Sequence, residues 1–243
     1  MVVEHKRAVG ARRGRGATMD DFELIIDTAD IESIRKCDEI LDVQGVTTNP
    51  TIITKTGKPA EQAIGDLVEY LRPDQKLFVQ VVATDLDGIM SEARRIARLR
   101  PENTYAKIPV THAGLRAIKQ CRREGIGTLA TAIYSSDAAF MAAHNGADYL
   151  AAYVNRMCNY GDGVQDVVDL IDMLAIQGSR SKLLAASFKN VDQAHKLILA
   201  GAQALTLPPD VALAMVGHPG TQIAVDEFSA NWRKAYDRDT LFG

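Results

Sequence analysis

Eight short apolar runs, separated by longer segments with helical spacing, constrain the fold of this chain most strongly. Each run has five to seven residues, which is the length of a buried strand. Several runs lack the alternation of apolar and polar residues, as expected for parallel strands that are covered on both faces. The runs span residues 22–27, 43–47, 77–82, 104–108, 127–133, 148–153, 182–187 and 203–207.

The segments between these runs carry the start and stop signals of helices. Asp30 precedes the first of them and is suited to cap a helix N-terminus. Glycines follow four helical stretches just before the next strand, where a left-handed residue usually ends a helix; they are Gly125, Gly146, Gly178 and Gly201. The clearest helical segments span residues 30–41, 85–99, 112–123, 163–177 and 190–200.

Eight strands alternating with about eight helices predict an α/β protein built as a single (β/α)8 TIM barrel. A doubly wound open sheet is the competing architecture. The barrel is favoured because polar residues concentrate at many strand ends rather than at one switch point. We therefore expect one domain over residues 20–243, which is within the size that a single core can organise.

An extra helix is predicted over residues 219–236, after the eighth unit, so the barrel does not need it for closure. It carries an apolar stripe of Ile223, Val225, Phe228, Trp232 and Tyr236. One interpretation is that the helix packs on its own barrel. The other is that it reaches a neighbouring subunit, since exposed aromatic stripes suit interfaces.

Composition excludes several classes of protein. With 47% hydrophobic and 24% charged residues the body of the chain is not disordered. No run approaches the roughly 20 apolar residues of a membrane helix, and a net charge of −3 gives no case for nucleic-acid binding. The three cysteines, Cys37, Cys121 and Cys158, form no CxxC pair. Neither a disulfide framework nor a zinc site is expected, and a reducing cytoplasm fits best.

Residues 1–19 differ from the rest of the chain. They hold five basic side chains and one acidic residue, Glu4, so residues 20–243 are left with 23 Lys and Arg against 30 Asp and Glu. An Arg-rich, acid-poor leader is one property of a transit peptide. The leader lacks the amphipathic pattern of such peptides, which favours a disordered tail or a true start at Met19.

Polar side chains gather where the predicted strands end. In a (β/α)8 barrel the reactive groups lie at these carboxyl ends, so the set predicts a single site. The candidates in chain order are Asp27, Thr47, Asn49, Gln80, Lys107, Thr131, Tyr153, Arg156, Ser187 and Lys189.

Lys107 is the most informative of these candidates, because it lies inside a strand that is otherwise suited to burial. Lysine is almost never fully buried without a partner. Burial disfavours the ammonium form, and a neutral amine attacks carbonyls and forms a Schiff base. The alternatives are that Lys107 extends to the barrel mouth or forms a structural ion pair with Asp27.

Arg156, Ser187 and Lys189 follow the sixth and seventh strands and offer a guanidinium, a hydroxyl and an ammonium group. Barrels often bind phosphate near their last strands, and Arg binds it with two parallel hydrogen bonds. The alternative is that both cations are solvated loop charges. The five histidines show no metal-ligand spacing, and no GxGxxG or P-loop motif occurs, so neither a metal nor a nucleotide cofactor is expected.

Five ordered motifs resemble the transaldolase family, and most closely its short branch of fructose-6-phosphate aldolases and transaldolase-like proteins. The similarity runs from about residue 22 to the C-terminus and leaves out residues 1–19. The motifs lie at residues 26–30, 45–50, 107–111, 153–156 and 185–189.

The resemblance implies a (β/α)8 barrel with Lys107 as the Schiff-base residue on strand four. It implies that Asp27 and Asn49 orient the donor hydroxyls and the carbinolamine, with Thr47 among the substrate-binding residues. A catalytic water would be held by Gln80, Thr131 and Tyr153.

The same resemblance implies that Arg156 and Ser187 hold the phosphate of the acceptor. Lys189 stands where longer transaldolases carry Arg. Residues 157–160 depart from the polar, Gly-rich loop that usually follows the arginine. This departure leaves the identity of the sugar open.

Gln80 favours one activity within the family, since members resembling true transaldolases carry Glu there. We expect a cofactor-free class I aldolase that reversibly cleaves fructose 6-phosphate to dihydroxyacetone and glyceraldehyde 3-phosphate. The alternative is a transaldolase that passes the three-carbon unit to another aldehyde. A remote alternative is a non-catalytic sugar-phosphate-binding barrel. The resemblance also implies a homo-oligomer, a pentameric ring or a decamer of two rings, with the last helix on a neighbouring subunit.

Overall fold

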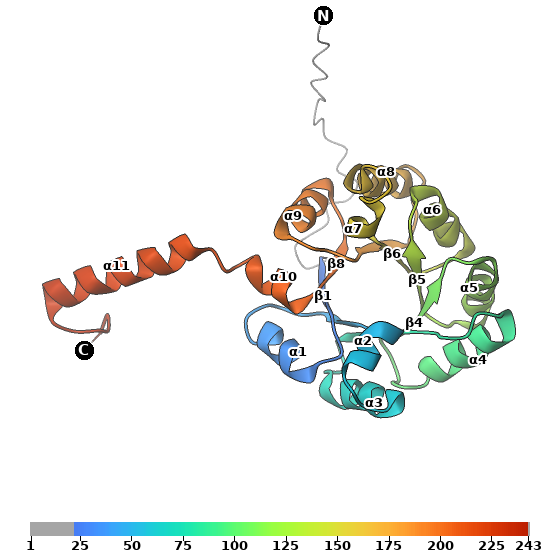
Figure 1. Ribbon diagram of the computed structural model, residues 1–243, viewed down its shortest axis with the longest axis horizontal. Coiled ribbons are helices and arrows are strands. Elements are labelled where there is room, and N and C mark those ends of the chain that lie inside the picture. Colours follow the sequence, from blue (N-terminus) through green and yellow to red (C-terminus); the bar gives the residue numbers. More distant parts are fainter. Residues whose placement is uncertain (1–21, 243) are drawn as a thin grey trace, which may run out of the picture.

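The computed structural model describes residues 22–242, and in it eight parallel strands close into a barrel in the order β1 to β8 (Figure 1). Each predicted apolar run contains one strand or overlaps it within a residue or two. The predicted α/β class and (β/α)8 architecture are therefore confirmed. The strands are β1 (Glu23–Asp27), β2 (Gly45–Thr47), β3 (Lys76–Gln80), β4 (Thr104–Pro109), β5 (Thr128–Ile133), β6 (Tyr149–Ala152), β7 (Lys182–Ala185) and β8 (Ala204–Leu207).

Eleven helices accompany the strands in the described part of the chain, rather than about eight. Several of the additional helices, such as α2, α7 and α10, have only four to six residues. Such short helices show too little periodicity to be found in a sequence. The helices are α1 (Ile31–Asp38), α2 (Pro50–Lys55), α3 (Ala60–Tyr70), α4 (Leu86–Ile96), α5 (His112–Glu124), α6 (Ser136–Asn145), α7 (Val154–Met157), α8 (Gly163–Ile176), α9 (Val191–Ala200), α10 (Pro209–Ala214) and α11 (Pro219–Tyr236).

The helix boundaries follow local signals in the sequence. Asp30 caps α1, and its carboxylate accepts a hydrogen bond from the Ser33 backbone N–H at 3.0 Å. Gly125 and Gly146 end α5 and α6 in the left-handed conformation, with φ of 69° and 99°. Because glycine has no Cβ, it adopts this conformation without the steric cost that other residues meet.

Two apolar layers hold the barrel together. The larger layer lies between the strands and the surrounding helices and includes Val79, Ala106 and Ile108. The smaller one fills the barrel interior and includes Ile25, Phe78, Leu129, Tyr149 and Leu184. Because successive residues of a strand point to opposite sides, each strand contributes to both layers.

The same alternation lifts the polar candidates above the inner apolar layer. Phe78, Leu129 and Ile25 belong to the inner cluster, and two residues further along each strand stand Gln80, Thr131 and Asp27. Lys107 likewise stands two residues beyond Tyr105, which packs against the inner cluster. The interior is therefore apolar in its middle and polar at its carboxyl end, where barrel enzymes carry their active sites.

Buried charge closes the opposite end of the barrel. Glu23 is 5% exposed and pairs with Lys182 at 2.5 Å and Lys76 at 3.6 Å. The Tyr149 hydroxyl donates to the same carboxylate at 3.0 Å, and burial raises the pKa of that phenol well above its ordinary value. Removing one partner of this buried carboxylate would leave an uncompensated charge and so destabilise the folded protein.

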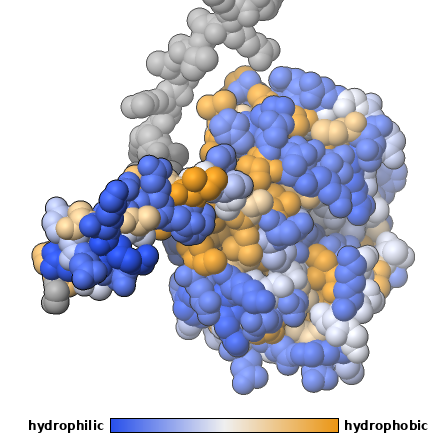
Figure 2. All heavy atoms as spheres, turned by 60° about the vertical axis from the view of Figure 1, so that its left-hand side comes forward, coloured by the Kyte–Doolittle hydropathy of each residue, from blue (hydrophilic) through white to orange (hydrophobic). Residues whose placement is uncertain are grey.

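Helix α11 leaves the barrel instead of packing on it (Figure 1). None of its residues is buried, and Ile223 and Phe228 are each 68% exposed. Figure 2 shows that apolar surface is also exposed on the barrel beside the point where α11 leaves it. The structure confirms the extra C-terminal helix, and the interpretation that it packs on its own barrel is wrong.

The leader of residues 1–19 lies outside the described residues. Within residues 22–242, no helix combines the length and the apolar character that a membrane crossing requires.

Candidate active site

A cavity of about 670 Å³ opens at the carboxyl ends of the strands. Seven of the ten predicted side chains line it, although they come from strands or loops that are distant in the sequence. Those seven are Asp27, Asn49, Gln80, Tyr153, Arg156, Ser187 and Lys189. The other three, Thr47, Lys107 and Thr131, are buried beneath it, and each is beside a lining residue or bonded to one.

Lys107 is the most unusual member of the set. Its side chain is 2% exposed, and its Nζ donates to the backbone oxygen of Thr48 at 3.1 Å. Lys107 neighbours Gln80 in the β3–β4 register. Among residues 22–242 no carboxylate lies within ion-pair distance of Lys107, so the predicted alternative of a pair with Asp27 is not present. The alternative of a side chain extended into solvent is excluded by its burial.

Asp27 accepts a hydrogen bond from Thr47, which is in turn bonded to Thr206. The Thr47 hydroxyl donates to Asp27 Oδ1 at 2.7 Å and lies 2.6 Å from the hydroxyl of Thr206. Both threonines are buried, whereas Asp27 is half-buried and lines the cavity. The network fixes one carboxylate oxygen and leaves the other able to contact a ligand. Thr206 was not among the site residues predicted from the sequence.

Asn49 stands at the junction of β2 and α2 and serves both elements. Its side-chain oxygen accepts the Ile52 backbone N–H at 3.0 Å and so caps α2. This bond orients the amide, so that the side-chain nitrogen remains as a donor at the cavity wall.

Thr131 and Tyr153 contact each other: Tyr153 lines the cavity, and Thr131 is buried beneath it. The Thr131 hydroxyl donates to the Tyr153 hydroxyl at 3.1 Å, and so joins β5 to the residue that follows β6. Gln80 contributes a side-chain oxygen that is buried and has no hydrogen-bond partner among the described protein atoms. An acceptor of this kind is costly unless a bound group satisfies it.

Cationic groups lie on one side of the cavity mouth. Arg156 and Lys189 line the cavity and are both exposed. Ser187 lines it as well and is half-buried. The Arg156 guanidinium lies over the ring of Tyr153, with 5.1 Å between Cζ and the ring centroid. Its Nη1 donates to the hydroxyl of Tyr134 at 3.1 Å. This hydrogen bond raises the pKa of Arg156 above its ordinary value.

Two non-glycine residues at the cavity have left-handed backbone conformations. Ala132 has φ of 53° and Ser187 has φ of 63°. Ala132 follows Thr131 in β5, where the register with β6 shifts. Such conformations cost about 1–3 kcal/mol each and concentrate at functional sites. Neither could have been foreseen, because alanine and serine do not mark a left-handed residue in a sequence.

The cavity has further lining residues that the sequence patterns did not single out. Tyr134 follows β5, and Lys55 ends α2, while Asn155 and Asp210 come from α7 and α10. A signal existed for Tyr134, since it follows a strand end by one residue. Lys55 and Asp210 lie in or beside helices too short to be placed from periodicity.

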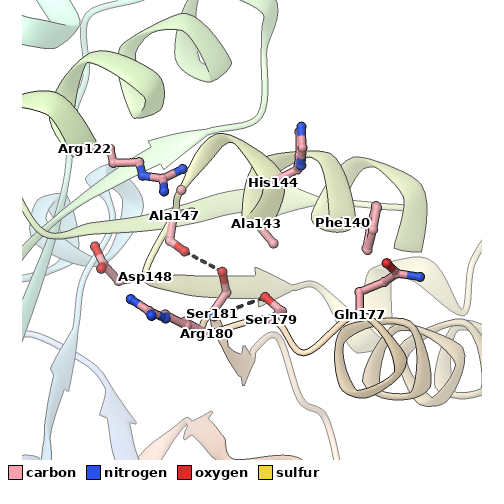
Figure 3. A pocket seen from close by; sticks show the side chains of 11 residues that line it. Arg122, Phe140, Ala143, His144, Ala147, Asp148, Gln177, Ser179, Arg180 and Ser181 are labelled. Carbon is pink, nitrogen blue, oxygen red and sulfur yellow. Dashed lines mark hydrogen bonds between the residues drawn. The ribbon is translucent and has the colours of Figure 1, made fainter.

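A second cavity, of about 460 Å³, lies at the opposite end of the barrel (Figure 3). It is bordered by the C-terminal ends of α5, α6 and α8. Its cations, Arg122 and Arg180, share the space with Asp148, which accepts the Thr128 backbone N–H at 2.8 Å. The Ser181 hydroxyl donates to the carbonyl of Ala147 at 2.7 Å. Helix C-termini disfavour anions, so this end is the weaker candidate for a sugar-phosphate site.

A closed eight-stranded parallel barrel with a buried lysine beneath a polar cavity defines a (β/α)8-barrel enzyme. The chain belongs to the transaldolase/fructose-6-phosphate aldolase family, which matches residues 24–241. It is 42% identical over 214 residues to a Streptococcus pneumoniae protein described as "Probable fructose-6-phosphate aldolase". The match covers 87% of this chain and 96% of that protein. The predicted family is thereby confirmed, and an enzyme of the aldolase and transaldolase type is indicated.

Solved structures with low sequence identity share the barrel alone. A structure described as native KDPGal has a TM-score of 0.53 at 17% identity, over 80% of this chain and 85% of that chain. Thiamine phosphate pyrophosphorylase from Pyrococcus furiosus has a TM-score of 0.52 at 16% identity, over 79% and 88%. Their similarity supports the fold and says nothing of the reaction.

Proposed function

We propose that this protein is a class I aldolase that reversibly cleaves fructose 6-phosphate into dihydroxyacetone and glyceraldehyde 3-phosphate. The observation that carries the proposal is Lys107: its side chain is 2% exposed and has one backbone acceptor and no carboxylate partner among residues 22–242. A buried amine without a counter-ion is placed to act as a nucleophile toward a carbonyl group.

The reaction begins with attack of the Lys107 nitrogen on the C2 carbonyl of the sugar. Loss of water from the carbinolamine gives an iminium, which accepts the electron pair of the C3–C4 bond when that bond breaks. The C4 hydroxyl loses its proton in this step, and glyceraldehyde 3-phosphate departs. The remaining enamine takes a proton at carbon, and hydrolysis of the resulting iminium releases dihydroxyacetone and regenerates Lys107.

The surrounding residues suit the proton transfers in these steps. Thr131 and Tyr153 are hydrogen-bonded to each other, and Gln80 adds an acceptor without a protein partner. Together they suit a water molecule that exchanges protons with the carbinolamine and the enamine. Asp27 and Asn49 offer an acceptor and a donor for the hydroxyls of the substrate. Arg156, Ser187 and Lys189 suit the phosphate.

Borohydride trapping tests the covalent step directly. In the presence of fructose 6-phosphate and borohydride, we expect a reduced adduct on Lys107, located by peptide mass spectrometry. Lys107→Met should keep the fold, because it replaces a buried amine by an apolar chain of similar size. It should lower cleavage by about 10³-fold or more. Lys119→Met, the same change at an exposed lysine of α5, is the matched control.

The product assay separates the alternatives. Release of free dihydroxyacetone without an added aldehyde supports the aldolase. Product formation that requires erythrose 4-phosphate would instead establish a transaldolase. Substrate binding that survives Lys107→Met, with no adduct in the unmodified chain, would establish a non-catalytic binding protein and overturn the proposal.

A further inference from the structure

Arg156 extends into the mouth of the cavity and is exposed, so it needs contacts that fix its direction. Within residues 22–242 no carboxylate lies within ion-pair distance of its guanidinium. Two tyrosines provide the contacts instead. Tyr153 supports the face of the guanidinium at 5.1 Å, and the Tyr134 hydroxyl accepts from Nη1 at 3.1 Å.

The two tyrosines are also packed against each other. The rings of Tyr134 and Tyr153 meet edge to face, with centroids 5.8 Å apart. The ring of Tyr160 also meets that of Tyr134 edge to face, with centroids 6.1 Å apart. Edge-to-face contacts favour defined ring positions. The hydroxyl that meets Arg156 therefore belongs to a ring held from two sides, although Tyr134 itself is 41% exposed.

We propose that Tyr134 is a positioning residue that makes the enzyme prefer phosphorylated acceptor aldehydes, because its hydroxyl holds the Arg156 guanidinium in the direction that a phosphate requires. The proposal rests on the proposed function and assigns a role to a residue outside the sequence motifs. Tyr134 acts through Arg156 and takes no part in bond making at Lys107.

A phenol is well suited to this task. A carboxylate would also orient the guanidinium, but it would cancel the positive charge that attracts a phosphate dianion. The hydroxyl engages one N–H and leaves the remaining donors of Arg156 for two parallel bonds to phosphate.

Tyr134→Phe tests the proposal, because it removes the hydroxyl and keeps the ring contacts. Synthesis is measured from dihydroxyacetone with either glyceraldehyde 3-phosphate or unphosphorylated glyceraldehyde. We expect KM for the phosphorylated aldehyde to rise about five- to twentyfold, as fits a partly exposed hydrogen bond to a charged group. The change in KM for glyceraldehyde should be several-fold smaller, and kcat should fall less than KM rises. Tyr160→Phe is the matched control, because it removes a hydroxyl of the same cluster that does not bond Arg156.

A double-mutant cycle shows whether Tyr134 acts through Arg156. In an Arg156→Met background, Tyr134→Phe should no longer change the preference between the two aldehydes. Equal losses with both aldehydes, or an undiminished effect without Arg156, would overturn the proposal while leaving the aldolase intact. If the unmodified chain shows neither turnover nor a Lys107 adduct, the proposed function fails. Calorimetric titration with inorganic phosphate then decides: equal affinities of the unmodified chain and Tyr134→Phe would overturn the positioning role.

Discussion

At the scale of single residues, the proposed chemistry depends on how Lys107 is kept free of counter-ions. Its neighbour in the register is Gln80, a neutral amide, and its Nζ donates to the Thr48 carbonyl. Asp27, a carboxylate that lines the same cavity, is engaged by Thr47. An opposite charge next to an amine favours the charged form. With a neutral side chain at position 80, Lys107 has no counter-ion from β3, as the proposed Schiff-base chemistry requires.

Gln80→Glu tests this dependence. The new carboxylate, beside Lys107 in the register, would give the amine a counter-ion, and we expect cleavage to fall severalfold. It also changes proton delivery to the enamine, and we expect transfer to erythrose 4-phosphate to rise severalfold relative to release of dihydroxyacetone. Both products are measured for the two variants and the unmodified chain under the same conditions. Gln80→Met is the control for loss of the amide. The same ratio of transfer to release in both variants would contradict the prediction.

At the scale of elements, the junction of β4 and α5 secures the strand that carries Lys107. Thr111 caps α5 by accepting the Gly114 backbone N–H at 3.0 Å. A Cβ at Gly114 would lie 1.9 Å from the carbonyl oxygen of Pro109, the last residue of β4. The first turn of α5 therefore lies directly on the strand end, and only glycine permits that approach.

Gly114→Ala should destabilise the protein by about 1–3 kcal/mol, because the helix or the strand end must shift to admit the methyl group. A chain of this size should lose about 2–4 °C in melting temperature for each kcal/mol. Gly65→Ala is the matched control, since nothing lies within 4 Å of a Cβ at that exposed helical position. It should stabilise by up to about 1 kcal/mol. If calorimetry shows an equal fall in melting temperature for both variants, the close approach at Gly114 is unimportant for stability.

At the scale of the whole molecule, α11 is the element without a partner in its own barrel. An 18-residue helix with no buried residue has no packing within the chain to stabilise it. Its apolar side chains include Ile223, Val225 and Phe228, all exposed. We propose that these exposed apolar side chains pack on other copies of the chain and that the protein assembles as a pentameric ring or a pair of rings.

Removal of residues 218–243 should reduce the assembly to smaller species, measured as mass in solution by light scattering. Phe228→Glu in the full chain places a charge on the apolar face and should have the same effect without shortening the protein. Glu227→Gln, at the neighbouring exposed position, should leave the mass unchanged. If neither the shortened chain nor Phe228→Glu dissociates, α11 does not hold the assembly.

The sequence by itself determined the eight-unit barrel, because strands, helices and their caps depend on local patterns of apolar, charged and turn-forming residues. It also placed the polar candidates at one end, since the carboxyl ends of parallel strands in a barrel lie on the same face. Lys107, Gln80 and Arg156 were identified in this way. The order of strands around the barrel and the burial of Lys107 beside Gln80 agree with that prediction.

The tertiary structure alone decided how those side chains meet and where the last helix goes. The contact of Lys107 with the Thr48 carbonyl and that of Arg156 with Tyr134 join residues 59 and 22 positions apart, on different strands and loops. The left-handed backbone at Ala132 and Ser187 is imposed by surrounding packing rather than by residue type. The departure of α11 from the barrel likewise depends on the surface that it meets, because an apolar stripe specifies burial but not the partner that provides it.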